Sequence, residues 1–242
     1  DGVQHHRADL TDADSLRPVL DGADALFFQN GGMSAHLIDP HAVLDAAKAG
    51  GVRRVVLLSS QGVATRPDSA SHGVVAGRIE DAVRGSGLDW TILRPGGFAS
   101  NAYAWAESVR ASRTVAAPFG DVGLPAVDPS DIAAVGAAAL RGDGHAGRIY
   151  ELTGPAPVTP RQQARAIGDA LGEPVGFVEL TRDQAREHML RFMPEPVVET
   201  TLSILGEPTE AERRVSPDVE NVLGRPARTF AEWARRNAPA FR

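Results

Sequence analysis

Three short polar segments of the sequence combine glycine with side chains that donate and accept hydrogen bonds, and each follows a run of apolar residues. The segments are Gln29-Asn30-Gly31-Gly32, Ser59-Ser60-Gln61-Gly62 and Arg94-Pro95-Gly96-Gly97. Because glycine has no side chain, a ligand can approach the main chain closely at these positions. Three such segments together favour a ligand site over three ordinary turns.

The sequence contains no motif for metal binding and none for catalysis by a thiol or serine nucleophile. The chain has no cysteine, which excludes disulfides and thiolates. Its seven histidines show no H-x-x-x-H spacing, and no acidic cluster lies at metal-ligand intervals. The nucleophile elbow G-x-S-x-G is also missing. We therefore expect no metal site.

The composition is that of an ordinary globular protein, with 43% hydrophobic and 23% charged residues. A formal net charge of −6 disfavours direct binding to nucleic acid. No apolar stretch approaches the ~20 residues that cross a bilayer, so no membrane span is expected. Together with the lack of cysteine, these features predict a cytoplasmic protein.

The apolar runs alternate with amphipathic segments of helical length, which is typical of βα units around a parallel sheet. Strands are expected over residues 23–28, 53–60 and 89–95, and helices over Pro40–Ala49, capped by Asp39, and over Val74–Arg84. In an open parallel sheet, ligands bind beyond the carboxyl ends of the strands. We therefore expect Asn30, Ser60 and Gly96 to lie side by side at one rim.

The pattern changes after residue 95, where glycine and proline are frequent and the strands shorter. We expect a helix over residues 128–140 capped by Ser130 or Asp131, strands over 148–154 and 175–180, and a helix capped by Thr159 between them. Near the start, Val3–His6 is interpreted as the end of a strand. The segment after residue 181 is expected to be mainly helical.

These patterns predict an α/β fold, with a doubly wound parallel sheet and a small C-terminal α/β lobe. We expect a single unit over residues 1–242. Residues 1–110 would form mainly the sheet core, and residues 111–242 mainly the lobe, with returns to the core.

The order of the segments resembles the NmrA-like, atypical branch of the extended short-chain dehydrogenase/reductase superfamily. The segments that carry the resemblance are ADLTDADSL, ADALFFQNGG, RRVVLLSSQG, GLDWTILRPGGFASN, VDPSDIAAVGAAAL and GRIYELTGP. The resemblance implies a Rossmann-type fold that binds NAD(P), most simply NADP(H), and a C-terminal lobe that binds a small-molecule substrate. The choice between NAD and NADP is not readable from these residues.

The same resemblance implies roles for individual residues. Asp9 and Leu10 would contact adenine, because a carboxylate can accept from the adenine amino group; the alternative is that Asp9 caps the next helix. The remaining residues would line the cofactor from adenosine to nicotinamide: Gln29, Asn30 and Gly31 along the path, Ser59 and Ser60 at the nicotinamide floor, and Pro95, Gly96 and Phe98 beside the carboxamide.

Two features of the family are missing. The first is the glycine-rich phosphate loop G-x-x-G-x-x-G, which receives the pyrophosphate at a helix N-terminus. We therefore expect the sequence to be a truncated piece that is poorly stable and binds NADPH weakly by itself. A cooperative melt together with micromolar NADPH affinity would refute this expectation.

The second is the catalytic Tyr-Lys pair, in which lysine lowers the pKa of the phenol. The helix expected to carry the pair reads SHGVVAGRIEDAV over residues 71–83, and the only lysine is Lys48. Ser60 and His72 are the remaining candidates for a proton relay, although a loop serine and a helix-start histidine are the simpler interpretations.

Two functions remain open from the sequence. The first is an NAD(P)H-dependent oxidoreductase that passes hydride to a quinone, an enone or a similar small apolar acceptor, for which positioning can suffice. The second is a non-catalytic redox sensor that binds NAD(P) and a protein partner. Isomerisation of a nucleotide sugar is a weaker third, because it also depends on the missing pair. The oligomeric state stays open.

Overall fold

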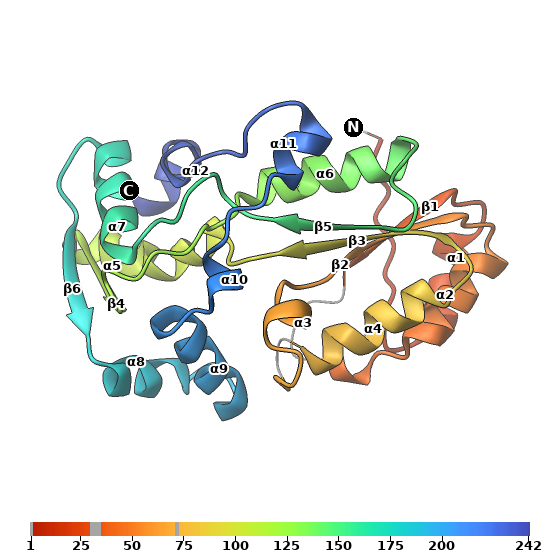
Figure 1. Cartoon of the computed structure of the whole chain (residues 1–242), viewed down its shortest axis with the longest axis horizontal. Coiled ribbons are helices and arrows are strands. Elements are labelled where there is room, and N and C mark those ends of the chain that lie inside the picture. Colours follow the sequence, from red (N-terminus) through yellow and green to blue (C-terminus); the bar gives the residue numbers. More distant parts are fainter. Residues whose placement is uncertain (1, 30–34, 71–72) are drawn as a thin grey trace.

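The main sheet has four parallel strands in the order β1-β2-β3-β5. The strands are β1 (Ala25–Gln29), β2 (Arg54–Leu58), β3 (Asp89–Pro95) and β5 (Arg148–Leu152) (Figure 1). The computed structural model describes residues 2–29, 35–70 and 73–242. The three strands expected in the first half of the chain are confirmed, and the strand expected over residues 148–154 is the fourth, β5.

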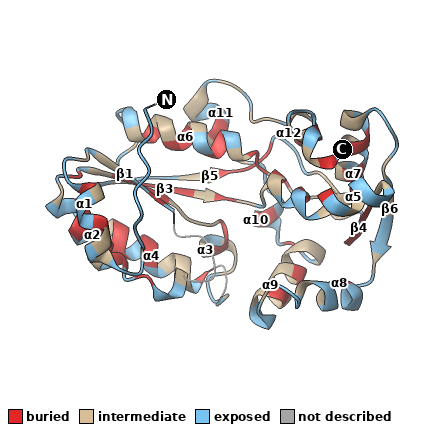
Figure 2. Ribbon diagram, turned by 180° about the vertical axis from the view of Figure 1, so that it is seen from behind, coloured by how far each residue is buried: buried red, intermediate tan, exposed pale blue. Residues whose placement is uncertain are grey.

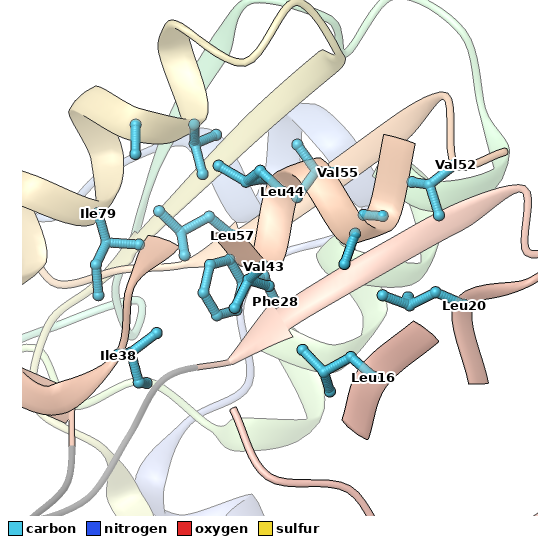
Figure 3. Packing of buried hydrophobic residues seen from close by; sticks show 14 of the residues in the cluster. Leu16, Leu20, Phe28, Ile38, Val43, Leu44, Val52, Val55, Leu57 and Ile79 are labelled. Carbon is cyan, nitrogen blue, oxygen red and sulfur yellow. The ribbon is translucent and has the colours of Figure 1, made fainter. Parts of the chain in front are cut away.

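Helices cover both faces of this sheet, so the doubly wound fold is confirmed (Figure 1). The helices of one face are α1 (Ala13–Leu20), α2 (Pro40–Ala49) and α4 (Val74–Arg84). Phe28, Leu44 and Ile79 belong to the buried cluster on this face (Figure 3). On the other face, α6 (Pro129–Arg141) and α11 (Asp218–Leu223) pack in a cluster around Val56 and Leu93.

A smaller lobe is built on a second parallel sheet of two strands, β4 (Thr114–Pro118) and β6 (Gly176–Leu180). The helices of this C-terminal lobe are α5 (Ala106–Ser112), α7 (Pro160–Leu171), α8 (Arg182–Met189), α9 (Glu195–Gly206), α10 (Glu210–Arg213) and α12 (Phe230–Asn237). Its core contains the buried rings of Phe230, Trp233 and Phe241. Figure 2 shows the same division, with buried residues along β3 and on the inner sides of the helices.

Four shorter helical segments connect these elements. They are α3 (Gly62–Thr65) and the 3-10 helices η1 (Ala35–Leu37), η2 (Ala99–Trp105) and η3 (Ala238–Phe241). Of these, α3 matters most for the site, because it follows β2 directly.

Local signals explain most helix ends. Asp39 caps α2, with its Oδ1 accepting from the backbone N–H groups of His41 at 3.0 Å and Ala42 at 3.3 Å. Pro40 occupies the first turn, where its missing N–H costs nothing. The expected cap Thr159 of α7 is also confirmed.

Two local expectations are wrong. Residues 2–8 form no strand and are exposed, because β1 pairs only with β2 among the described residues and offers Val3–His6 no ladder. The cap of α6 is Asp128, whose side chain accepts from the Ser130 N–H at 2.9 Å. Pro129 takes the first helical position, so the residue before it becomes the cap.

Candidate functional site

The carboxyl ends of the main strands meet at one rim. Gln29 pairs with Leu58, and Leu58 with Leu93, in parallel register. The alignment continues beyond the strands, where Gln61 N–H donates to the Pro95 carbonyl at 3.0 Å. We define the rim as Gln29, residues 59–62 and residues 95–97. Figure 1 shows the arrowheads of β3 and β5 pointing from the sheet toward the C-terminal lobe.

The structure therefore brings Ser60 and Gly96 to the same rim, as the sequence predicted. Gln29 lies at the end of the neighbouring strand and is exposed. Asn30 and Gly31, and the candidate relay His72, lie outside the described residues.

The main chain is exposed at Gly97, whereas Gly96 is half-buried and its N–H donates to the Leu152 carbonyl at 3.0 Å. A Cβ atom on Gly96 would come within 3.2 Å of Gln61 Oε1, whereas one on Gly97 would meet nothing within 4 Å. The neighbouring Ser60 Oγ accepts from Gly62 N–H at 3.0 Å, which leaves its own hydroxyl proton to donate elsewhere. The rim thus combines exposed backbone with one hydroxyl group.

Ser59 points away from this open surface. Its hydroxyl donates to Oε1 of Glu80 on α4 at 2.6 Å. Glu80 is completely buried and also accepts from Arg94 Nε at 2.9 Å, Arg94 Nη2 at 2.6 Å and Arg84 Nη2 at 2.5 Å. The hydrogen bond with Glu80 raises the pKa of Arg94. The Ser59 side chain is therefore used to fasten the end of β2 to α4.

Sequence reasoning missed Glu80. The sequence nevertheless indicated a buried partner for Arg94. Arg94 lies on the same face of the strand as Trp90 and Ile92, four and two residues earlier, and Ile92 is buried. A charged side chain in such a row requires a buried partner. The sequence did not say which acidic residue that partner is.

Asp9 and Leu10 differ in their surroundings. Asp9 is exposed, and its Oδ1 accepts from both the N–H and the hydroxyl of Thr11 at 2.8 Å. These bonds, the backbone one first, lower the pKa of Asp9. Asp12 caps α1, so the alternative role of Asp9 as a cap is wrong. Leu10 packs against the cluster of Phe28, and the adenine contact stays a prediction.

Pro95 and Phe98 shape the other side of the rim. Pro95 is buried at the end of β3, and Phe98 is half-buried against the cluster of Val56 and Leu93. Phe98 is also held by a parallel bridge to Val127. The contact of both residues with the cofactor stays a prediction.

The C-terminal lobe is attached to the rim at α10. Gln61 Nε2 donates to the Ala211 carbonyl at 3.2 Å. Arg66 donates to Glu212 through two bonds, from Nε to Oε1 at 2.8 Å and from Nη2 to Oε2 at 3.0 Å. The capping box of Thr209 and Glu212 is visible in the sequence. The contact with Arg66, 146 residues away, was missed.

Glu212 should make stability depend on pH. Burial raises the pKa of its carboxyl, but hydrogen bonds from Arg66 and the Thr209 backbone outweigh burial, so the pKa is lowered. A lowered pKa stabilises the fold above the ordinary pKa of about 4.3, and this stabilisation disappears as the pH falls through the lowered value. Glu212→Gln should therefore cost about 1–3 kcal/mol at neutral pH and progressively less below pH ~4.

Urea unfolding of both proteins across this pH range measures the difference. Glu210→Gln is the matched control, because Glu210 is exposed on the same helix. A deficit of Glu212→Gln that stays constant down to pH ~3 would contradict the assignment.

In the part of the chain that the structure describes, no group of three or more His, Cys, Asp or Glu side chains is placed to hold a metal ion. No helix there is both long and apolar enough to span a membrane.

Comparisons with known proteins agree with this geometry. Residues 1–143 match a family model described as NAD(P)H-binding. A (4-alkanoyl-5-oxo-2,5-dihydrofuran-3-yl)methyl phosphate reductase from Streptomyces griseus subsp. griseus is 39% identical over 242 residues, which is 99% of this chain and 85% of the relative. An NAD(P)H azoreductase from Xenophilus azovorans is 34% identical, over 99% of this chain and 84% of the relative.

Among solved structures, the Escherichia coli NADPH-dependent quinone oxidoreductase complexed with NADPH superposes with a TM-score of 0.79 at 23% identity, over 97% of this chain and 83% of that chain. NmrA, a negative transcriptional regulator, in complex with NADP gives a TM-score of 0.68 at 18% identity, over 94% and 78%. These two show the shared fold. The chain belongs to the NAD(P)H-binding family that the model describes.

Proposed function

We propose that the protein is an NAD(P)H-dependent reductase that passes hydride to an activated small acceptor, such as a quinone or an enone. The observation that carries the proposal is the rim itself, where parallel strands end in open main chain beneath a second lobe. Two relatives above 30% identity, one named as a furanone phosphate reductase and one as an azoreductase, support it.

The residues at the rim fit a nucleotide cofactor. Gly97 offers exposed backbone without a side chain, half-buried Gly96 lies next to it, and Ser60 supplies a hydroxyl at the same rim, so a flat ring could approach the main chain there. Bound NAD(P)H would supply the hydride. The chain would hold the cofactor and the acceptor in contact, and for a conjugated acceptor this positioning can suffice. The anion formed on the acceptor would take a proton from water, either directly or through the Ser60 hydroxyl, which would regain its proton from water.

A Tyr-Lys mechanism is not available to these residues. Lys48 pairs with Asp45 on α2 at 2.8 Å. The Tyr103 hydroxyl donates to Asn237 in the C-terminal lobe at 2.5 Å, and Tyr150 lies on β5 with a pKa raised by burial. None of these groups is paired as the ordinary mechanism requires, so we propose NADP(H) chemistry that needs no tyrosine acid.

The test follows NADPH absorbance in the full-length protein with a panel of quinones and enones. We expect oxidation of NADPH that depends on acceptor concentration, with mixtures lacking acceptor or protein as controls. Tight binding of NADPH without turnover across the whole panel would contradict a reductase. It would favour the alternative, a redox sensor that reports to a protein partner.

A further inference from the structure

We propose that Arg66 is a positioning residue that fixes the C-terminal lobe over the rim and thereby sets the affinity for the acceptor, not for NAD(P)H. This inference rests on the proposed function for its kinetic consequence. Its structural part stands on the contacts of one side chain.

Arg66 gathers three parts of the lobe. Besides its two bonds to Glu212 on α10, Nη1 donates to the Ser203 hydroxyl on α9 at 2.8 Å, and Nη2 donates to the Glu207 carbonyl at 3.3 Å. We call this set the Arg66 clamp. In Figure 1, α9 and α10 lie beside α3, whose last residue precedes Arg66.

The clamp is well buried for an ion pair. The side chain of Arg66 is 19% exposed and that of Glu212 is 4% exposed. A paired fork of this kind fixes direction as well as distance, because the guanidinium is planar and both of its bonds must align. Exposed ion pairs, such as Arg17 with Asp14, lack this constraint.

The clamp is connected to the rim through α3. Gln61, at the start of α3, is bonded through its backbone N–H to Pro95 and through its side chain to Ala211 on α10. The same side chain lies close to Gly96. A Cβ atom added to Gly96 would stand only 3.2 Å from Gln61 Oε1. The backbone bond to Pro95 holds Gln61 on the rim whatever α10 does, so a shift of α10 mainly changes how the lobe stands over the rim, where the acceptor is proposed to lie.

A shallow hollow of about 490 Å³ adjoins the clamp, lined by residues 65–69 and by α9. Its wall includes Arg66 and Ser203, and Ser69 contacts Thr200 across it at 3.2 Å. Loosening the clamp would change the spacing of these two walls. It would leave the backbone ladder of β2 and β3, which supports the cofactor, in place.

The test compares Arg66→Met, Arg66→Lys and Glu212→Gln in the full-length protein. Glu212→Gln keeps the capping box, since glutamine also serves at that position, and removes only the ion pair. Arg161→Met is the matched control, because Arg161 pairs with Asp121 and Glu179 inside the lobe, away from α9 and α10.

We expect Arg66→Met to raise the KM of the acceptor about tenfold, the size of one charge-assisted hydrogen bond, while kcat and the Kd of NADPH change less than about twofold. Arg66→Lys should recover part of the loss. The double variant with Glu212→Gln should be no worse than Arg66→Met, because the two residues act as one pair. An unchanged KM, an equal change in NADPH affinity, or the same effect in Arg161→Met would overturn the inference.

Hydrogen exchange separates this inference from the proposed function. Arg66→Met should speed exchange in residues 195–213 and leave residues 54–58 unchanged. If the wild-type protein reduces no acceptor, the proposed function fails, and exchange alone decides the clamp. Faster exchange confined to 195–213 then supports the clamp, and unchanged exchange overturns it.

Discussion

Replacing Glu80 by alanine is expected to lower the free energy of unfolding by about 3–5 kcal/mol, because the guanidinium of Arg94 would stay buried without its ion-pair partner. Glu80 is fully buried and accepts two bonds from Arg94, one from Arg84 and one from Ser59. Arg94 is 14% exposed and sits on a central strand, so it has little access to water once its partner is gone. Urea unfolding at neutral pH measures the change.

The neighbouring carboxylate provides the control. Asp81 contacts Arg84 at 3.0 Å, but its side chain is 80% exposed, so Asp81→Ala should cost no more than about 0.5 kcal/mol. A loss for Glu80→Ala as small as that of Asp81→Ala would contradict the role of Glu80. The rim should also be held less firmly, because the Ser59 side chain would lose the only hydrogen bond that it makes within the described residues.

Replacing Gly96 by valine is expected to weaken NADPH binding about 10–100-fold, or about 1.4–2.7 kcal/mol. The added side chain would occupy the open surface where the cofactor ring is proposed to lie, and its Cβ would already stand 3.2 Å from Gln61 Oε1. Titration of NADPH fluorescence gives the Kd. A melting curve shows that the variant is folded.

Asp89→Val is the matched control for this variant. Asp89 is the first residue of the same strand, at the end of the strand opposite to the rim, and it is exposed. The same side chain placed there should leave the Kd unchanged. If the two valine variants bind NADPH equally well, the cofactor does not lie on Gly96, and the rim loses its proposed role.

The sequence determined the main sheet and its rim through patterns that are local. Runs of apolar residues end in glycine and polar residues three times, and parallel strands joined by helices must present their carboxyl ends at one edge. Helix caps such as Asp39 before Pro40 were readable because the groups that satisfy them lie within a few residues. The C-terminal lobe was predicted from the change of pattern after residue 95, where glycine and proline become frequent and the strands shorter.

Only the tertiary structure decided which charged residues meet. Glu80 with Arg94, and Arg66 with Glu212, lie 14 and 146 residues apart, and no local rule selects these partners from the many Arg and Glu residues of the chain. Packing also turned Ser59 toward Glu80 and away from the open surface. Local hydrogen bonds and periodicity depend on residues that are close in the sequence, whereas the partner of a buried charge depends on how distant elements are brought together.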